Sequence, residues 1–188
     1  VQQGETVCIF GAGAIGLLLA QVAKARGATV IVAGLRNDEE RFAIARKCGV
    51  DRTVDQQSEN LDAIIAEMTS GVGVDKAFEC SGAVPAVNKA LQIIKKKGKV
   101  IQMGVFPKEM ESIQTDLILN KESEYRGSRS QKPTSWGTSI QLRGEGSVRP
   151  EEIVSESVTL EGLRPAFDAA IRGEGAKGVI RCNEDMNE

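Results

Sequence analysis

A glycine-rich segment near the start of the chain has the composition and the position of a phosphate-binding loop. Residues 11–16 read Gly-Ala-Gly-Ala-Ile-Gly, between an apolar run at 6–10 and a stretch at 15–26 where apolar residues recur every three to four positions. In a strand–loop–helix context, the first glycine permits a tight turn, the second lets the backbone approach a pyrophosphate, and the third lets helix and strand pack closely. The N–H groups and dipole of the helix start favour the anion. We therefore predict a dinucleotide site, with a ligand-free glycine turn as the alternative. Its candidate residues are Gly11, Gly13, Ala14, Ile15 and Gly16.

The end of the second predicted strand, about 20 residues further on, bears on which dinucleotide binds. An NAD site usually has an acidic residue there, which accepts hydrogen bonds from the ribose hydroxyls. This chain has Gly34, Leu35 and Arg36 instead. A carboxylate would repel a 2′-phosphate, whereas the planar guanidinium of arginine can bind one. We therefore expect NADP(H) to be preferred over NAD(H), with a solvated loop arginine as the alternative for Arg36.

Three charged residues that follow keep the choice of cofactor open. Asp38 and Glu39 can bend back toward the ribose, which would suit NAD(H). Arg41 can reach the ribose or its phosphate, or lie on the surface of the next helix. That helix is expected to begin at Asn37, with Glu40 as its partner three residues later.

The 188 residues include no histidine. Histidine is the commonest general base and metal ligand, so Ser-His-Asp and Cys-His nucleophiles and histidine-containing metal sites are excluded within this sequence. Glu79 and Cys80 end a predicted strand without a visible catalytic partner, and Trp136 suits packing. We therefore expect neither a catalytic residue nor a metal ligand here.

The net charge and the cysteines indicate which partners and which cellular compartment to expect. The net charge is −2 and the isoelectric point is near 5.5, which argues against a protein held to nucleic acid by phosphate contacts. The cysteines have no CxxC spacing and lie in apolar or helical stretches, which favours buried free thiols in a reducing compartment, with disulfide pairing in a secreted protein as the alternative. Neither a signal peptide nor a transmembrane-length apolar run is present. We expect a cytoplasmic protein without a membrane partner. The four cysteines are Cys8, Cys48, Cys80 and Cys182.

The elements that position these residues alternate along the chain. Apolar runs typical of strands buried on both faces alternate with helical periodicity, which predicts an α/β fold with a doubly wound parallel sheet in three αβα layers, of the Rossmann type. The predicted strands are 6–10, 29–33, 52–55, 75–80 and 99–105, and helices include 15–26, 61–68 and 85–97. Residues 113–119 and 125–129 are expected to add edge strands, and 135–143 a helix. A polar linker at 144–150 then leads to a strand at 154–160, a helix at 162–171 and a strand at 178–181.

Several of these segments together resemble the zinc-containing medium-chain alcohol dehydrogenases, above all the sorbitol, threonine and alditol-phosphate dehydrogenase branch. The resemblance covers essentially the whole chain. Its segments are GETVCIFGAGAIGLLLAQVAKARGA (4–28), AFECSGA (77–83), GKVIQMGVF (98–106), YRGSRSQKPTSW (125–136) and LRPAFDAAIRGEGAKGVI (163–180).

The resemblance implies a division into two parts. Residues 1–147 correspond to the family's dinucleotide-binding Rossmann domain, and 148–188 to its C-terminal return into a GroES-like catalytic domain. That domain supplies the family's zinc ligands, including a histidine. The chain starts without an initiator Met just before its first strand and contains no Gly-His-Glu motif. We therefore expect a fragment that binds the cofactor but is inactive by itself, with zinc held only in the catalytic domain.

The resemblance also implies roles for individual residues. Arg41 matches a basic residue at the adenosine ribose, and the turn at 34–36 resembles that of NADP-using members. Thr115 to Leu119 match an edge strand through which family members dimerise, and an unpaired strand edge is itself a pairing site. Ordinary loop structure is the alternative for Ser81, Ser128 and Arg129. The implied contacts further along the chain are Cys80, Ser81 and Gly82 beside the adenosine half, Gly104 and Val105 at the nicotinamide, and Ser128 and Arg129 over the nicotinamide ribose.

The function so implied is hydride transfer between a nicotinamide cofactor and a small secondary alcohol or polyol. Two alternatives stay open. One is a zinc-free, quinone-reductase-like member of the same superfamily, and the other is a non-enzymatic dinucleotide-binding regulatory module.

Overall fold

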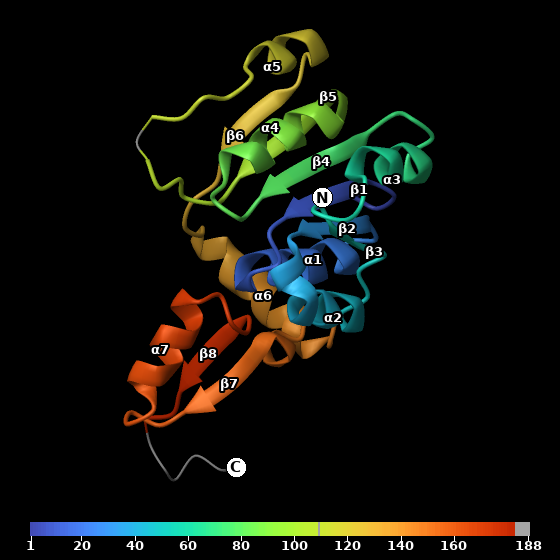
Figure 1. The fold of residues 1–188 in the computed structure, drawn as a ribbon. Helices are drawn as coiled ribbons and strands as arrows, with labels where there is room; N and C mark the ends of the chain where they lie inside the picture. The colour runs from blue at the N-terminus through green and yellow to red at the C-terminus, as the bar shows by residue number, and fades with distance from the viewer. Residues whose placement is uncertain (109, 183–188) are drawn as a thin grey trace.

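A six-stranded parallel sheet forms the centre of the computed structural model, which describes residues 1–108 and 110–182 (Figure 1). Its order is β3-β2-β1-β4-β5-β6, with every neighbouring pair parallel. This order confirms the predicted doubly wound fold, because the chain runs outward from β1 in one direction and then from β4 in the other. The strands are β1 (Thr6–Phe10), β2 (Thr29–Gly34), β3 (Arg52–Asp55), β4 (Val74–Glu79), β5 (Ile94–Gln102) and β6 (Glu124–Gly127).

Helices cover both faces of this sheet because alternate strand residues point to opposite sides. Val7 and Ile9 lie in one buried cluster, which includes Leu17 of α1 (Ala14–Ala25) and Phe42 of α2 (Glu39–Lys47). Cys8 and Phe10 lie in a second cluster, with residues of α3 (Leu61–Met68) and α4 (Val84–Ile93). These two clusters give the three layers that the sequence predicts. None of the helices in the described part of the chain is long and apolar enough to cross a membrane.

The predicted helix at 85–97 is too long at its C-terminal end. The helix stops at Ile93, and Ile94 already pairs with Val74 of β4. The pairing then jumps to Lys76 with Lys99, so the residues between form a bulge, within which Lys97 has a φ of +59°. The helical spacing misled the prediction because Ile94 is buried in either conformation.

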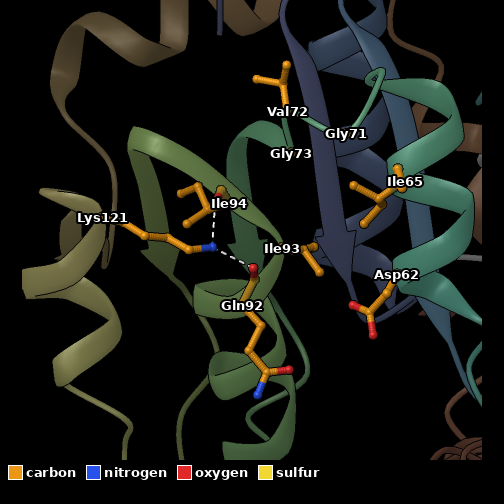
Figure 2. Close-up of a pocket in the computed structure, with 10 residues that line it drawn as sticks. Asp62, Ile65, Gly71, Val72, Gly73, Gln92, Ile93, Ile94 and Lys121 are labelled. Carbon is orange, nitrogen blue, oxygen red and sulfur yellow. Dashed lines mark hydrogen bonds between the residues drawn. The ribbon is translucent and has the colours of Figure 1, made fainter.

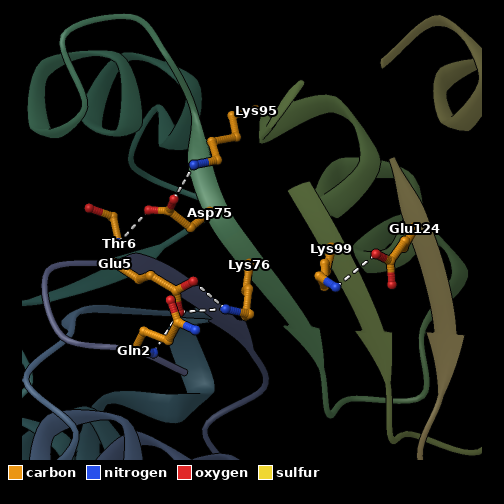
Figure 3. Close-up of polar contacts among 8 residues, drawn as sticks. All are labelled: Gln2, Glu5, Thr6, Asp75, Lys76, Lys95, Lys99 and Glu124. Atoms are coloured by element: carbon orange, nitrogen blue, oxygen red, sulfur yellow. Dashed lines mark hydrogen bonds and ion pairs between the residues drawn. The ribbon is translucent and has the colours of Figure 1, made fainter. Parts of the chain in front are cut away.

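Ion pairs hold the amino-terminal ends of the strands (Figure 3). The side chain of Lys95 pairs with Asp75, whose other oxygen accepts a hydrogen bond of 2.8 Å from the backbone N–H of Thr6. Lys76 pairs with Glu5 in the same region. Lys95, the second residue of β5, is therefore tied to the start of β4.

The predicted edge strand at 113–119 is also wrong. The chain forms a short helix there, α5 (Asp116–Lys121), whose Leu117 and Ile118 pack against the core. Lys121 donates to the carbonyl oxygens of Gln92 and Ile94 at the end of α4 and lines a cavity of about 220 Å³ (Figure 2). Thr115 to Leu119 thus present no strand edge for dimerisation. A short apolar run by itself does not distinguish a strand from a buried helical turn.

Residues 133–180 form further elements beside the sheet. They are α6 (Pro133–Gly144), the 3-10 helix η2 (Pro150–Ile153), and β7 (Val154–Val158), α7 (Leu163–Ile171) and β8 (Lys177–Ile180), with β7 and β8 paired in parallel. The amide of Gln21 on α1 exchanges two hydrogen bonds with the backbone of Arg149, and Ile153 is buried against the same helix layer. The segment beyond residue 147 is therefore docked on α1 at its start.

Candidate functional site

The segments that follow five of the strands lie in one row. After four of them, β1, β4, β5 and β6, the first residues beyond the strand extend the ladder by donating a backbone hydrogen bond to the neighbouring strand. Because all strands are parallel, these segments meet along the carboxyl edge of the sheet in the order β2, β1, β4, β5, β6. The bonds are Gly11 to Ala33, Cys80 to Phe10, Met103 to Glu79 and Ser128 to Gln102, each 2.8 Å from N to O.

The three glycines of the loop at 11–16 have different reasons to be glycine. Gly11 has a φ of +101°, and a Cβ there would lie 3.0 Å from the backbone nitrogen of Ser81. A Cβ on Gly16 would lie 2.0 Å from the carbonyl oxygen of Gly11. The fold itself therefore requires these two. Gly13 has an ordinary extended backbone, and a Cβ on it would meet nothing within 4 Å.

The same loop leads into α1, and backbone N–H groups at the start of this helix have no acceptor among the described residues. Leu17 makes the first bond of the helix, 2.9 Å from its nitrogen to the carbonyl oxygen of Gly13. Within the described residues, the N–H groups of Ala14, Ile15 and Gly16 donate to no other residue, and the first turn has no acidic side chain. Unpaired N–H groups and the positive end of the helix dipole form a place for an anion. The open space at Gly13 lets that anion come close to the backbone.

The turn after β2 is built around Asp38. One carboxylate oxygen accepts a 2.9 Å hydrogen bond from the N–H of Leu35, and the other pairs with Arg41 at 2.8 Å. A Cβ on Gly34 would lie 2.6 Å from the first of these oxygens, so the glycine makes room for the carboxylate. Both oxygens of Asp38 are thus engaged within the protein. Asp38 also takes the N-cap position expected for Asn37, because a 3-10 turn η1 (Arg36–Asp38) precedes α2.

The two arginines predicted near the adenosine ribose differ in their freedom. The guanidinium of Arg36 is exposed and makes no hydrogen bond or ion pair with a described residue, while its backbone N–H donates to Gln57 at 3.0 Å. Arg41 instead donates to the carbonyl oxygens of Gly173 and Gly175, at 2.6 and 2.7 Å. Arg36 is therefore the cation available to a ligand at the end of β2.

A buried carboxylate organises the turn after β4. Glu79 is fully buried, and its Oε1 accepts hydrogen bonds from the backbone N–H and hydroxyl of Ser81 and from the N–H of Gly82, at 2.6, 2.5 and 2.8 Å. A Cβ on Gly82 would lie 2.5 Å from the carbonyl oxygen of Val105, so this turn packs closely on the loop after β5. Glu79, for which the sequence showed no catalytic partner, thus holds the backbone of the turn after β4 in place.

Cys80 in the same turn is not set up as a nucleophile. Burial raises the pKa of its thiol to about 12, and the neighbouring charge of Glu79 acts in the same direction. A thiol that stays protonated at neutral pH is a weak nucleophile. The thiol of Cys80 is therefore not activated in this turn.

A cavity of about 470 Å³ lies between the ends of β5 and β6. It brings together the four residues predicted at the nicotinamide half, which are Gly104, Val105, Ser128 and Arg129. It also includes residues that the sequence analysis missed, namely Gln102, Met103, Phe106, Lys108 and Gly127. Gln102 and Gly127 end their strands, so the carboxyl-edge rule alone is enough to find them. The hydroxyl of Tyr125 donates to the side-chain oxygen of Gln102 and fixes that amide.

The described residues include no group of three or more histidine, cysteine or acidic side chains placed to hold a metal ion. The donor set for a zinc ion is therefore not formed within this part of the chain.

Comparisons with known proteins agree with this geometry. The family model for zinc-binding dehydrogenases matches residues 14–143. The chain is 42% identical over 181 residues to D-arabitol-phosphate dehydrogenase of Enterococcus avium, covering 96% of this chain and 51% of that protein. It is 38% identical over 180 residues to sorbitol dehydrogenase of Halalkalibacterium halodurans, covering 96% and 52%. A zinc-binding dehydrogenase of Sinorhizobium meliloti, solved with NADP, superposes with a TM-score of 0.80 at 28% identity, covering 96% and 52%. The chain thus spans about half the length of each.

Proposed function

Because the chain belongs to the zinc-binding dehydrogenase family, we propose that it binds a nicotinamide dinucleotide as part of an alcohol or polyol dehydrogenase. The observation that carries this proposal is the start of α1. There, the open space at Gly13 lies beside backbone N–H groups that donate to no described residue. A pyrophosphate has the charge and acceptor oxygens to fill this position.

The proposed contacts follow the row of strand ends. The loop at 11–16 holds the pyrophosphate, and the turns at 34–36 and 80–82 hold the adenosine half. Gly104 and Val105 approach the nicotinamide through their backbone, and Ser128 and Arg129 close over its ribose. A dinucleotide lying across the middle of a doubly wound sheet spans such a set of loops. Arg41 supports the site indirectly, by holding Asp38 in place, because its guanidinium is already engaged with Asp38 and residues 173–175.

We further propose a preference for NADP(H). The free guanidinium of Arg36 suits a 2′-phosphate, and Gly34 offers no acidic side chain to repel it. Asp38 is the carboxylate within this turn, and the hydrogen bond from Leu35 and the ion pair with Arg41 engage both of its oxygens. The relative with NADP bound supports this choice of cofactor.

The reaction proposed for the whole protein is oxidation of a secondary alcohol to a ketone. When bound, NAD(P)⁺ accepts a hydride from the carbinol carbon and becomes NAD(P)H, while the hydroxyl proton is released. The residues of this chain contribute binding and orientation. The strand-end loops fix the two halves of the cofactor, and the apolar side chains around Gly104 line the nicotinamide side. Zinc ligands would come from residues outside the described part. The names of the relatives make both polyols and polyol phosphates candidate substrates.

The cellular location, the self-association and the division of the chain into domains are proposals as well. We propose a cytoplasmic, self-associating enzyme in which residues 1–147 form the cofactor domain and 148–188 lead toward a catalytic domain. Strand pairing through 115–119 is not available for self-association, because α5 is helical.

Calorimetric titration of the chain with NADPH and NADH tests the binding function. We expect saturable binding of both, with NADPH the tighter ligand. A chain that is folded by circular dichroism and binds neither dinucleotide at millimolar concentration would overturn the proposal. Adenosine monophosphate serves as the control, since it lacks the pyrophosphate and is expected to bind more weakly.

A further inference from the structure

The end of β2 has no acidic side chain of its own, but a carboxylate from the following turn takes that place. A Cβ on Gly34 would lie 2.6 Å from Oδ2 of Asp38. The Asp38 carboxylate therefore fills the space into which a side chain at the end of β2 would extend. An acidic residue at this point of the fold is the one that binds the ribose hydroxyls of NAD. The same negative charge opposes a 2′-phosphate unless a cation of the protein balances it.

Arg41 is the cation that balances this charge. Its Nη1 donates to Oδ1 of Asp38 at 2.8 Å, and only 21% of the Arg41 side chain and 15% of the Asp38 side chain are exposed. Charges that are shielded from water in this way interact more strongly than charges at the open surface. The adjacent carboxylate of Glu39 does not compete for Arg41, because it pairs with Arg46 at 2.6 Å.

A turn far along the chain fixes the orientation of Arg41. Its Nε donates to the carbonyl oxygen of Gly175 at 2.7 Å, and its Nη2 donates to that of Gly173 at 2.6 Å. The two glycines have φ values of +61° and +79°, a backbone conformation that other residues rarely adopt. Among the described residues, no other hydrogen bond joins α2 to this turn. Since the two carbonyl groups carry no net charge, the charge of Arg41 remains directed at Asp38.

We propose that Arg41 is a positioning residue that sets the cofactor preference through Asp38. This inference rests on the proposed binding of a nicotinamide dinucleotide. With Arg41 in place, Oδ1 of Asp38 is occupied and its charge is balanced. The guanidinium of Arg36 is then the cation that remains for the cofactor, which favours NADP(H).

Without Arg41, the same turn suits the other cofactor. Oδ1 of Asp38 becomes free to accept a hydrogen bond from the 2′-hydroxyl of NAD(H), and the unbalanced carboxylate repels the 2′-phosphate of NADP(H). Loss of Arg41 is therefore expected to change the two affinities in opposite directions. A residue that only stabilises the fold would change both affinities in the same direction.

Calorimetric titration of wild type, Arg41→Ala, Asp38→Asn and the double variant with NADPH and NADH tests this inference. We expect Arg41→Ala to bind NADH about three- to tenfold more tightly and NADPH about tenfold more weakly, the factors for gaining one hydrogen bond and for leaving one charge unbalanced. Asp38→Asn removes the charge that Arg41 balances. Adding Arg41→Ala to Asp38→Asn is therefore expected to leave the ratio of the two affinities unchanged.

Two other substitutions of Arg41 separate its charge from its anchoring. Arg41→Gln keeps an amide donor for the carbonyl oxygens of the turn at 172–175 but has no charge, so it is expected to act in the same direction as Arg41→Ala even if the latter does not fold. Arg41→Lys keeps a cation beside Asp38 and is expected to retain most of the wild-type preference. Urea denaturation followed by circular dichroism shows which variants are folded.

Arg46→Ala is the matched control, because Arg46 lies on the same helix and is also paired, but with Glu39 and Thr53 instead of Asp38. It is expected to leave both affinities unchanged. Equal losses of NADPH and NADH affinity in Arg41→Ala and Arg41→Gln would overturn the inference. So would a change of the affinity ratio that persists in the Asp38→Asn background, since Arg41 would then act on the phosphate directly.

The wild-type titration keeps this inference apart from the proposals on which it rests. A folded wild type that binds neither dinucleotide overturns the binding proposal, and this inference with it, before any variant is compared. A wild type that prefers NADH overturns only the proposed preference for NADP(H), because the opposite changes in Arg41→Ala still decide whether Arg41 acts through Asp38.

Discussion

Replacing Arg36 with alanine tests the proposed cofactor preference. Its guanidinium is exposed and makes no hydrogen bond or ion pair with a described residue, and its backbone N–H holds Gln57 independently of the side chain. The substitution therefore removes a charge from the end of β2 without breaking a side-chain hydrogen bond or ion pair of the described fold. Neighbouring Asp38 keeps both of its partners, Leu35 and Arg41.

The expected magnitude follows from the bond that would be lost. A hydrogen bond between a guanidinium and a phosphate contributes about 1.5–3 kcal/mol. At about 1.4 kcal/mol for each factor of ten, NADPH binding is expected to weaken roughly 10- to 140-fold. NADH has no 2′-phosphate, so its affinity is expected to change less than about twofold.

Calorimetric titration of wild type and variant with both cofactors gives the four dissociation constants needed. Arg26→Ala is a matched control, because Arg26 is an exposed arginine after α1, at the opposite end of β2 from the binding edge. It is expected to leave all affinities unchanged. Equal losses for NADPH and NADH, or an unchanged affinity for NADPH, would refute the role of Arg36 at the 2′-phosphate.

Three further predictions concern the frame of the site. Gly16→Ala is expected to lower the free energy of unfolding by about 1–3 kcal/mol or more in urea denaturation, because the new Cβ would meet the carbonyl of Gly11. Glu79→Ala is expected to cost about 1–3 kcal/mol and to speed amide exchange in the turn after it, since three donors lose their acceptor; unchanged exchange would contradict this. Burial pushes the pKa of Asp75 upward, but bonds from Lys95 and the N–H of Thr6 outweigh it and leave the pKa lowered. The ionised Asp75 carboxylate therefore stabilises the fold above its unfolded pKa, near 3.9, and this stabilisation is lost as the pH falls through its folded pKa. The difference in the free energy of unfolding between wild type and Asp75→Asn should consequently shrink below about pH 4.

The sequence predicts the fold best where one signal is sufficient. The runs at 6–10 and 29–33 are apolar on both faces, and only a parallel sheet covered by two helix layers buries both. The glycine loop then locates the binding edge, because the turns after parallel strands all meet there. The family resemblance, with its sorbitol and alditol-phosphate branch, is confirmed by the comparisons.

The errors arise where periodicity gives two answers. Ile94 is buried, and an apolar residue at this position fits the end of a helical pattern as well as the start of a strand. Its pairing with Val74 assigns it to the strand. Leu117 and Ile118 are adjacent apolar residues, and whether they belong to a strand or a helix depends on Lys121 and the end of α4. Such contacts join segments that are separate in the sequence, so no local sequence pattern predicts them.

The candidate site shows the same limit. The positions of its residues were predictable from strand ends, but their partners were not. Arg41 donates to Gly173 and Gly175, more than 130 residues away in the chain. Asp38, which the sequence left open to bend back toward the ribose, is engaged with Leu35 and Arg41. Long-range hydrogen bonds of this kind decide which of two neighbouring arginines is free to bind a ligand.

Gly13→Ala is the measurement that tests the central claim most directly. The fold places no atom within 4 Å of the new Cβ and holds Gly13 in an ordinary extended backbone, so the unfolding temperature is expected to stay the same or rise. The pyrophosphate needs that space, so NADPH binding is expected to weaken at least tenfold. Gly137→Ala, equally free of neighbours but on α6, should keep both stability and binding. Unchanged NADPH affinity in a folded Gly13→Ala chain would contradict dinucleotide binding at this loop.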